Sequence, residues 1–392
     1  MKNLKVNQQA LAQMLNLSQT TISRSLANHP AINSETKALV LGAAASLGYS
    51  QRIKRPSTTR ENSSPAIWGV LITIPAWAKS RTETFQEVLK GISDKSSVHD
   101  SILDVFYNEP ESESENRESI LRRMRTAKWS GVILIYPISP SITHEIANLA
   151  ACVSIIENYD HDLIDSVDVD QSEGILSLVD HLYQQGHRKI AFMSWTYRVP
   201  APWVTHRLGS YVEGLYIHGL EFDPSLVVNA RPGSKMTPAQ CNESVHQLIG
   251  QGVTAVICAA DHQAYQLISY LRSQGIRVPQ DVSVTGFDGI LPPADHRPLA
   301  TVRVPNQELG RSAVHQLLRR IEQPTARRRH TMVDGEIILG ESTAPPATTA
   351  YRVKNGVKEA TSPEKESPGS RNGDPVLSAD LVGPPRLGQS PC

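Results

Sequence analysis

Apolar residues recur at helical spacing at the start of the chain, interrupted by one polar turn. Residues 6–28 predict two short helices, and Ile22 and Leu26, four residues apart, form one buried stripe of the second. Asn16 stands at the reversal between the helices, where asparagine tolerates the left-handed conformation better than most residues. Ser18 is a good N-cap for the second helix. The apolar positions expected on the inner face of the first helix and the turn are Leu11, Ala12, Leu15 and Leu17.

The second helix carries a polar edge beside its apolar stripe. The outward positions are occupied by Gln19, Thr20, Ser23 and Arg24. A helix-turn-helix places the N-terminal end of its second helix against base edges in the major groove. A third helix is expected to follow, with Ser34 as its N-cap. The pattern predicts a DNA-reading domain of three helices, and the alternative is an amphipathic helix pair with a solvated polar face.

Charge is distributed unevenly along the chain. The first 60 residues hold eight lysines and arginines against one acid, Glu35, although the formal charge of all 392 residues is zero. A local excess of positive charge is expected of a module that neutralises DNA phosphates. This asymmetry favours the DNA-binding interpretation of the N-terminal helices over the solvated helix pair.

From Ala66 onward, short apolar runs alternate with helical patterns, which predicts βαβ units and a parallel sheet. The expected strands are Ile67–Ile74, Ile102–Tyr107, Gly131–Tyr136, Val153–Glu157, Ile190–Ser194, Leu226–Asn229, Ala255–Ala259 and Val282–Phe287. The expected helices between them are 84–97, 113–128, 171–185, 204–218, 238–250 and 261–274. Residues 300–340 return through a strand and a helix over 306–322 to a final strand pair.

Composition sets the boundaries between domains. Residues 50–65 are polar and basic with two prolines, which is typical of a linker, and 347–392 are rich in proline, glycine, serine and charge, which predicts disorder. The expected domains are therefore 1–49, 50–65, 66–346 and a tail. No apolar run approaches the ~20 residues of a membrane span, and the N-terminal stretch is too polar for a signal peptide. The four cysteines form no C-x-x-C pair, so neither a zinc site nor a disulfide framework is expected.

The run LSQTTISRSLANHPAINSETKALVLGAAASLGY, residues 17–49, resembles the headpiece of LacI/GalR-family transcriptional regulators. That family has V-S-x-x-T-V-S-R-x-L-N in its recognition helix and L-G-Y at the end of its third helix. The resemblance implies that Gln19 and Thr20 read bases and that Arg24 contacts a guanine edge. It implies phosphate contacts for Ser18, Thr21, Ser23 and Asn28.

Several later segments extend the resemblance over about residues 6–346. They are VDVDQSEGILSLVDHLYQQGHRKIAF, AVICAADHQA, GIRVPQDVSVTGFDG and ESTAPP. They look like the family's effector-binding core, which implies a fold class of an all-α headpiece plus an α/β, periplasmic-binding-protein-like core of two Rossmann-like subdomains. Such a core closes two lobes around a small polar ligand.

Charged residues come after the strand-like run SVDV and after the expected strands Ile190–Ser194 and Val282–Phe287, where ligands bind in open α/β sheets. Asp170, Arg207 and Asp288 occupy these places, and the resemblance implies ligand contact for an arginine on one lobe and for the aspartate at the G-F-D corner. An arginine fork and carboxylates each make two hydrogen bonds, to sugar hydroxyls or to a purine-like edge. Asp261 is either a ligand contact or the N-cap of its helix. Apolar faces for a ligand ring, or alternatively core packing, are expected of Trp77, Phe85 and Trp203.

The linker departs from the family pattern. The family has P-N-x-x-A-R-x-L after L-G-Y, which forms a hinge helix and inserts a leucine into the minor groove, whereas this chain has SQRIKRPSTTR. Pro56 would break a helix at this place, and a polar residue near Thr58 replaces the leucine. Either Ile53 is the wedge or the linker lies along the minor groove as an extended basic arm. The arm is the favoured alternative, and its cations are Arg52, Lys54 and Arg55.

The sequence therefore predicts a homodimeric, cytoplasmic and nucleoid-associated regulator, more often a repressor in this family. Its partners are a pseudo-palindromic operator and a small effector such as a sugar. No cofactor or metal is expected, because the 13 histidines show no ligand spacing. The alternatives are an α/β enzyme and a solute-binding protein for a sugar-like ligand. The chain lacks G-x-S-x-G, the P-loop and G-x-G-x-x-G, so we expect no enzymatic activity.

Overall fold

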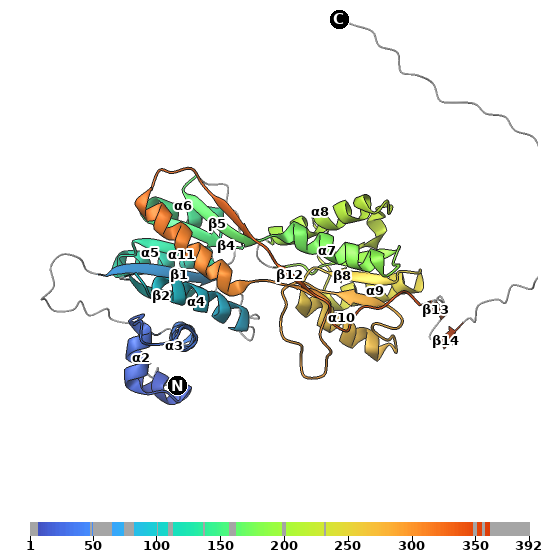
Figure 1. The fold of residues 1–392 in the computed structure, drawn as a ribbon, viewed down its shortest axis with the longest axis horizontal. Helices are drawn as coiled ribbons and strands as arrows, with labels where there is room; N and C mark the ends of the chain where they lie inside the picture. Colours follow the sequence, from blue (N-terminus) through green and yellow to red (C-terminus); the bar gives the residue numbers. More distant parts are fainter. Residues whose placement is uncertain are drawn as a thin grey trace, which may run out of the picture.

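The computed structural model shows a helical headpiece and two α/β lobes (Figure 1). The first lobe is built on a six-stranded sheet and the second on a four-stranded sheet. In Figure 1 the headpiece lies beneath helix α4 and strand β2 of the first lobe. The structure describes residues 7–47, 49, 65–73, 82–99, 101–108, 113–135, 138–156, 162–197, 201–230, 233–347, 351–354 and 357–360.

The headpiece has the three predicted helices. Asn16 ends the first helix in the left-handed conformation, with φ of 52°, and Ser18 caps the second by accepting a hydrogen bond from Thr21 N. The third helix is capped by Asn33, not by Ser34, because the Asn33 side chain accepts from Thr36 N at 2.7 Å. The helices are α1 (Gln8–Leu15), α2 (Gln19–Leu26) and α3 (Ser34–Ser46).

The sheet of the first lobe is entirely parallel, in the order β11-β5-β4-β3-β1-β2. Side chains alternate across it, so that Val70 and Ile72 face one helix layer and Leu71 the other. Helices α4 (Thr82–Ser96) and α11 (Asn306–Glu322) cover the first of these faces, and α5 (Glu113–Ala127) and α6 (Pro140–Leu149) cover the second. The strands are β1 (Ala66–Thr73), β2 (Ser101–Asn108), β3 (Gly131–Ile135), β4 (Ala151–Ile155), β5 (Ile164–Val169) and β11 (His330–Val333).

The sheet of the second lobe is also parallel, in the order β7-β6-β8-β9. Its two faces are covered by different helix pairs, α7 with α8 and α9 with α10. The strands are β6 (Ile190–Met193), β7 (Val227–Val228), β8 (Ala255–Cys258) and β9 (Ser283–Thr285). The helices are α7 (Gln171–Gln184), α8 (Pro202–Ile217), α9 (Pro238–Gly250), α10 (Asp261–Ser273) and the short 3₁₀ helix Pro224–Leu226.

The chain crosses between the lobes at three places that lie together. The first is the junction of β5 and α7, and the second leads out of β11 after Val333. Asp170 N of the first crossing donates to Val333 O of the second at 2.9 Å. The third crossing runs from β10 (Thr301–Arg303) into α11, and β10 pairs antiparallel with β12 (Glu336–Ile338). The crossings therefore join the carboxyl ends of the first lobe's strands to the second lobe.

A buried ion cluster fastens β5 to the end of α11. The Asp165 carboxylate is 0 % exposed and accepts from the guanidinium groups of Arg319 and Arg320 and from the backbone N of Arg329. Arg320 is itself 1 % exposed and also donates to two backbone carbonyls of the following loop. This cluster holds the strand that carries Asp168 and Asp170 to the crossing region.

The predicted strand and helix order agrees with the structure, with three differences. Helix α6 is not among the predicted elements, and β5 is indicated only by its last residues. The predicted final strand pair is present as β11 and β12, which pair with β5 and β10. The tail, expected to be disordered, contains a two-stranded antiparallel pair, β13 (Tyr351–Lys354) and β14 (Val357–Ala360). The rest of the tail from residue 361 and the linker over 50–64 lie outside the described residues.

Candidate DNA interface and effector site

The second helix of the headpiece presents the predicted polar edge to solvent. Gln19, Thr20 and Arg24 are exposed, and Ile22 and Leu26 on the opposite side are 0 % and 3 % exposed. The helix is short, and its first turn is held by the Ser18 hydroxyl. Ser18 and Ser23 are exposed and Thr21 is half-buried. The residues expected to read bases therefore share one accessible edge at the start of the helix.

Asn28, which the resemblance places on phosphate, does not share that edge in this arrangement. Its side chain is 4 % exposed and donates to Ser96 Oγ at 3.1 Å and to Ser101 O at 3.4 Å. Ser93 Oγ donates in turn to Asn28 Oδ1 at 3.3 Å. The amide is occupied by the first lobe because Asn28 lies just beyond α2, where the headpiece meets α4. Arg52, Lys54 and Arg55 lie outside the described residues.

Arg207 is the centre of the polar cluster at the crossings. Its side chain is 4 % exposed, and Nε donates to Gln171 Oε1 at 2.7 Å while Nη1 donates to the Ala259 carbonyl. The guanidinium lies 3.6 Å from the ring centroid of Phe287 and 4.6 Å from that of Trp203. Arginine suits such a site because its planar group stacks on aromatic faces and donates along fixed directions.

Acidic groups surround this guanidinium. Arg207 Nη1 lies 3.7 Å from Asp288 Oδ1, and the carboxylates of Asp168 and Asp261 also attract the cation. Burial lowers the pKa of Arg207, and these carboxylates oppose that shift. Burial raises the pKa of Asp168 to about 6, and it raises the pKa of Asp261 as well. The cluster therefore combines one buried cation with carboxyl groups that are costly to ionise.

Three of the aspartates predicted from the sequence have different structural tasks. Asp288 has a φ of 131°, a strained value for a non-glycine residue, and remains 33 % exposed beside Arg207. Asp170 caps α7 by accepting from Ser172 N and Glu173 N at 2.9 Å. Asp261 is not an N-cap, because its carboxylate accepts from Thr301 Oγ1 and Ile290 N. Asp288 is thus the predicted aspartate that faces Arg207 with exposed surface.

The predicted aromatic residues separate into different environments. Trp203 belongs to the cluster, and its ring packs on Tyr197 at 5.1 Å between centroids. Phe85 is 4 % exposed inside the apolar core of the first lobe, so little of its ring is open to a ligand in this arrangement. Trp77 lies outside the described residues. Of the two that the structure describes, Trp203 lies beside Arg207.

Sequence reasoning missed several polar residues of the cluster. Asp168 and Gln171 flank the predicted Asp170, and Gln171 Nε2 donates to Asp168 Oδ1 at 3.1 Å. Gln263 Nε2 donates to the Tyr197 hydroxyl at 2.5 Å, while its buried Oε1 has no partner within the described residues. The period-2 pattern of VDVD was a usable signal for Asp168, because it puts both aspartates of that run on the same side of the strand.

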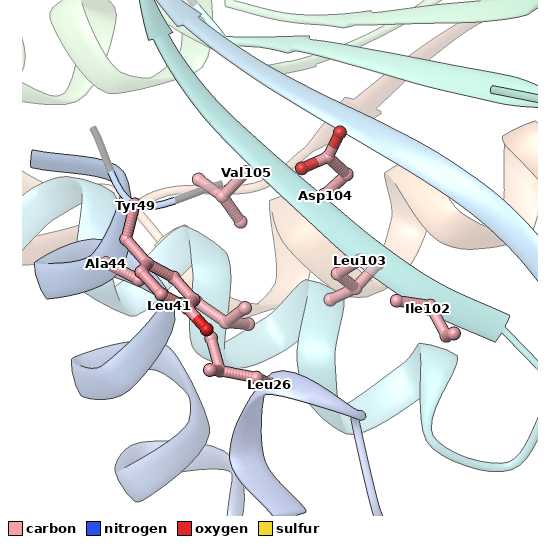
Figure 2. A pocket seen from close by; sticks show the side chains of 8 residues that line it. All are labelled: Leu26, Leu41, Ala44, Tyr49, Ile102, Leu103, Asp104 and Val105. Carbon is pink, nitrogen blue, oxygen red and sulfur yellow. The ribbon is translucent and has the colours of Figure 1, made fainter. Parts of the chain in front are cut away.

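Two cavities lie away from this cluster. One of about 360 Å³ is on the second lobe, beside Arg272, Arg277 and Arg297, each of which pairs with a carboxylate. A small one of about 20 Å³ lies between the headpiece and β2 (Figure 2). The described residues include no group of three histidine, cysteine or acidic side chains arranged to hold a metal ion.

The comparisons with known proteins agree on one class of protein. A family model for a periplasmic binding protein-like domain matches residues 179–343. The HTH-type transcriptional repressor CytR of Escherichia coli K12 is 26 % identical over 333 residues, 83 % of this chain and 93 % of CytR. The HTH-type transcriptional repressor PurR of Photobacterium profundum is 23 % identical over 85 % of this chain and 97 % of its own length.

Solved structures show the same fold. A complex of the transcriptional regulator CelR with cellobiose aligns with a TM-score of 0.58 and 20 % identity, over 86 % of this chain and 99 % of CelR. The lac repressor dimer bound to operator and an anti-inducer aligns with a TM-score of 0.56 and 18 % identity, over 87 % of this chain and 100 % of that one. The chain is similar along most of its length to LacI-family transcriptional regulators, and these matches support its assignment to the LacI/GalR family.

This similarity gives the two sites their meaning. In a LacI/GalR-family regulator, the exposed edge of α2 belongs to a DNA-binding headpiece, and the crossings join the two lobes of an effector-responsive core. The relatives matched are transcriptional regulators rather than enzymes. None of the helices within the described residues has the length and apolar character needed to cross a membrane.

Proposed function

We propose that this regulator is a homodimeric repressor that binds a pseudo-palindromic operator through Gln19, Thr20 and Arg24. The observation that carries the proposal is the exposed polar edge of α2 in the same chain as a two-lobed core. A two-fold dimer presents two such edges related by symmetry, which matches an operator with two half-sites. Repression is supported by the names of CytR and PurR.

The proposed effector is a sugar or a related polyhydroxyl metabolite bound at the cluster of Arg207 and Asp288. Hydroxyl groups donate to carboxylates and accept from a guanidinium, and the Trp203 ring offers an apolar face for a sugar ring. The neighbouring CelR structure contains cellobiose, a sugar, in the same fold. Trp77, Phe85, Asp170 and Asp261 stay in the proposed site as wall or supporting residues.

The proposed domains are the headpiece 1–49, the linker 50–65, the core 66–346 and the tail 347–392. The linker acts as a basic arm on the minor groove through Arg52, Lys54 and Arg55, because Pro56 interrupts a helix at that place. The protein acts in the cytoplasm on the nucleoid, needs no cofactor or metal, and has no catalytic activity of its own.

A ligand screen tests this proposal. Small sugars and nucleosides are added to the full-length protein, and the melting temperature is measured together with operator affinity by fluorescence anisotropy. A specific ligand at 100 times its dissociation constant adds about 2.7 kcal/mol of stability. We expect that ligand to change operator affinity and to be recovered intact. Consumption of the ligand would indicate an enzyme, and stabilisation with unchanged DNA binding would indicate a solute-binding protein.

A further inference from the structure

The headpiece is packed onto the first lobe through a defined surface, which we call the α4–β2 face. Leu26, Leu41 and Ala44 of the headpiece join the same buried apolar cluster as Leu103 and Val105 of β2. Figure 2 shows these side chains from the two sides of the contact, with Tyr49 beside them. The headpiece is thus docked on the lobe by side-chain packing.

Polar groups of the headpiece are withdrawn from solvent by this docking. Asn28 is bonded to Ser93 and Ser96 at the end of α4. Lys37 of α3 is 1 % exposed, and the carboxylate of Asp94 on α4 attracts its ammonium group. A lysine that could pair with a phosphate is therefore kept at the lobe surface.

The contact has the properties of a reversible one. Burial of Lys37 lowers its pKa, which means that docking desolvates a cation. The Ser25 hydroxyl is 0 % exposed and has no partner within the described residues. The small cavity beside Leu26 and Tyr49 also leaves part of the apolar contact unfilled. These costs oppose the apolar packing and make the headpiece easier to release.

Docking and operator binding compete for Asn28, which the resemblance to the family places on phosphate. Asn28 lies two residues beyond the end of α2 and has a left-handed backbone conformation, with φ of 51°. A DNA phosphate bound by Asn28 would occupy the space beside this side chain. In the docked arrangement that place is occupied by the end of α4.

The face that holds the headpiece is connected to the Arg207 cluster. Val304 N donates to Asp288 O at 3.2 Å, and α11 begins two residues later. Helix α11 is packed closely against α4, because Gly310 faces the Val88 carbonyl with no room for a side chain. A continuous packed path therefore links Asp288 to α4, which carries Ser93.

We infer that the α4–β2 face is an autoinhibitory dock for the chain's own headpiece. The headpiece binds either this face or operator DNA, so the two compete for it. The inference rests on the proposed function, since it assumes that α2 reads an operator. The surface of the first lobe then has a regulatory role. This role belongs to a chain whose linker contains Pro56.

A covalent lock tests the inference. Asn28→Cys and Ser96→Cys are combined in full-length protein, with Cys392→Ser to remove the cysteine of the tail; the cysteines Cys152, Cys241 and Cys258 are buried. The two thiols are joined by oxidation or, where they stand apart, by a short bismaleimide. We expect the locked protein to bind a selected operator at least tenfold more weakly than the uncrosslinked protein, with the disulfide form recovering on reduction.

Two results would overturn the dock. One is equal operator affinity of locked and uncrosslinked protein, and the other is failure of both oxidation and the bismaleimide to join the thiols. Each leaves the proposed function in place as long as the wild-type protein selects an operator. If the wild-type protein shows no site preference, the proposed function itself fails, and the two failures are distinguished.

A second variant opens the dock instead of locking it. Asp94→Lys places a cation beside Lys37 without touching any residue proposed to contact DNA, and we expect three- to tenfold tighter operator binding. Asp180→Lys in the second lobe is the matched control, because both aspartates are more than half exposed and each lies within 4 Å of one basic side chain. Equal effects of the two substitutions would show that added charge alone acts, and would contradict the dock.

Discussion

The carboxyl group of Asp168 predicts a specific pH dependence of stability. Burial raises its pKa from 3.8 to about 6, and the backbone N of Val169, Arg207 and Gln171 only partly oppose that shift. A carboxyl whose pKa is higher in the folded state binds its proton more tightly there than in the unfolded chain. The free energy of unfolding therefore falls as the pH rises from about 4 to about 6, and then levels off.

The magnitude follows from the shift. One pKa unit corresponds to 1.36 kcal/mol. A shift of about two units therefore means that the Asp168 carboxyl lowers the free energy of unfolding by about 3 kcal/mol more at pH 7 than at pH 4. Asp168→Asn removes the titration while keeping Oδ1, which accepts from Val169 N and Gln171 Nε2. Asp261, whose pKa is shifted in the same direction, is present in both proteins and largely cancels in the difference.

Urea unfolding of the wild-type protein and of Asp168→Asn between pH 4 and 7.5 measures this difference. We expect the wild-type protein to lose about 3 kcal/mol relative to the variant across that range, with most of the loss below pH 6.5. A difference that stays constant with pH, or that grows in the opposite direction, would refute the argument that burial dominates the Asp168 environment.

Three further substitutions test other parts of the account. If Arg24 binds a guanine edge, Arg24→Ala should cost about 1–3 kcal/mol of discrimination between operator and mismatched duplex. Anisotropy titrations measure this, and equal weakening on all sequences would assign Arg24 to phosphate instead. Asp165→Asn should lower the free energy of unfolding by about 3–5 kcal/mol, because it leaves the buried Arg320 uncompensated, and a loss below 1 kcal/mol in urea would contradict this. Asp288→Ala should abolish the effector response of operator affinity while leaving operator binding intact, and a normal response would remove Asp288 from the site.

The headpiece could be predicted from the sequence because its determinants are local. Asn16 and Ser18 set the turn and the cap, and the spacing of Ile22 and Leu26 sets the buried face, all within a few residues. The exposed edge with Gln19 and Arg24 follows from the same periodicity. The strand and helix order of the core was predictable for the same reason, since each βαβ unit shows its pattern within a short stretch.

The polar contacts of the core could not be predicted because they join distant segments. Asp165 meets Arg320, 155 positions away, and Asn28 meets Ser96, 68 positions away. Asp168 and Asp170 look equivalent in the run VDVD, yet one lies near Arg207 and the other caps α7. Which of them approaches the cluster is decided by how the crossings pack.

The central claim is that the headpiece of this protein reads a DNA sequence under control of the two-lobed core. Selection of bound sites from randomised duplex DNA by the full-length protein, with and without a metabolite extract, tests it most directly. We expect one pseudo-palindromic sequence to be enriched, and we expect the degree of enrichment to change when the extract is present. Recovery of unenriched sequences under both conditions would contradict it.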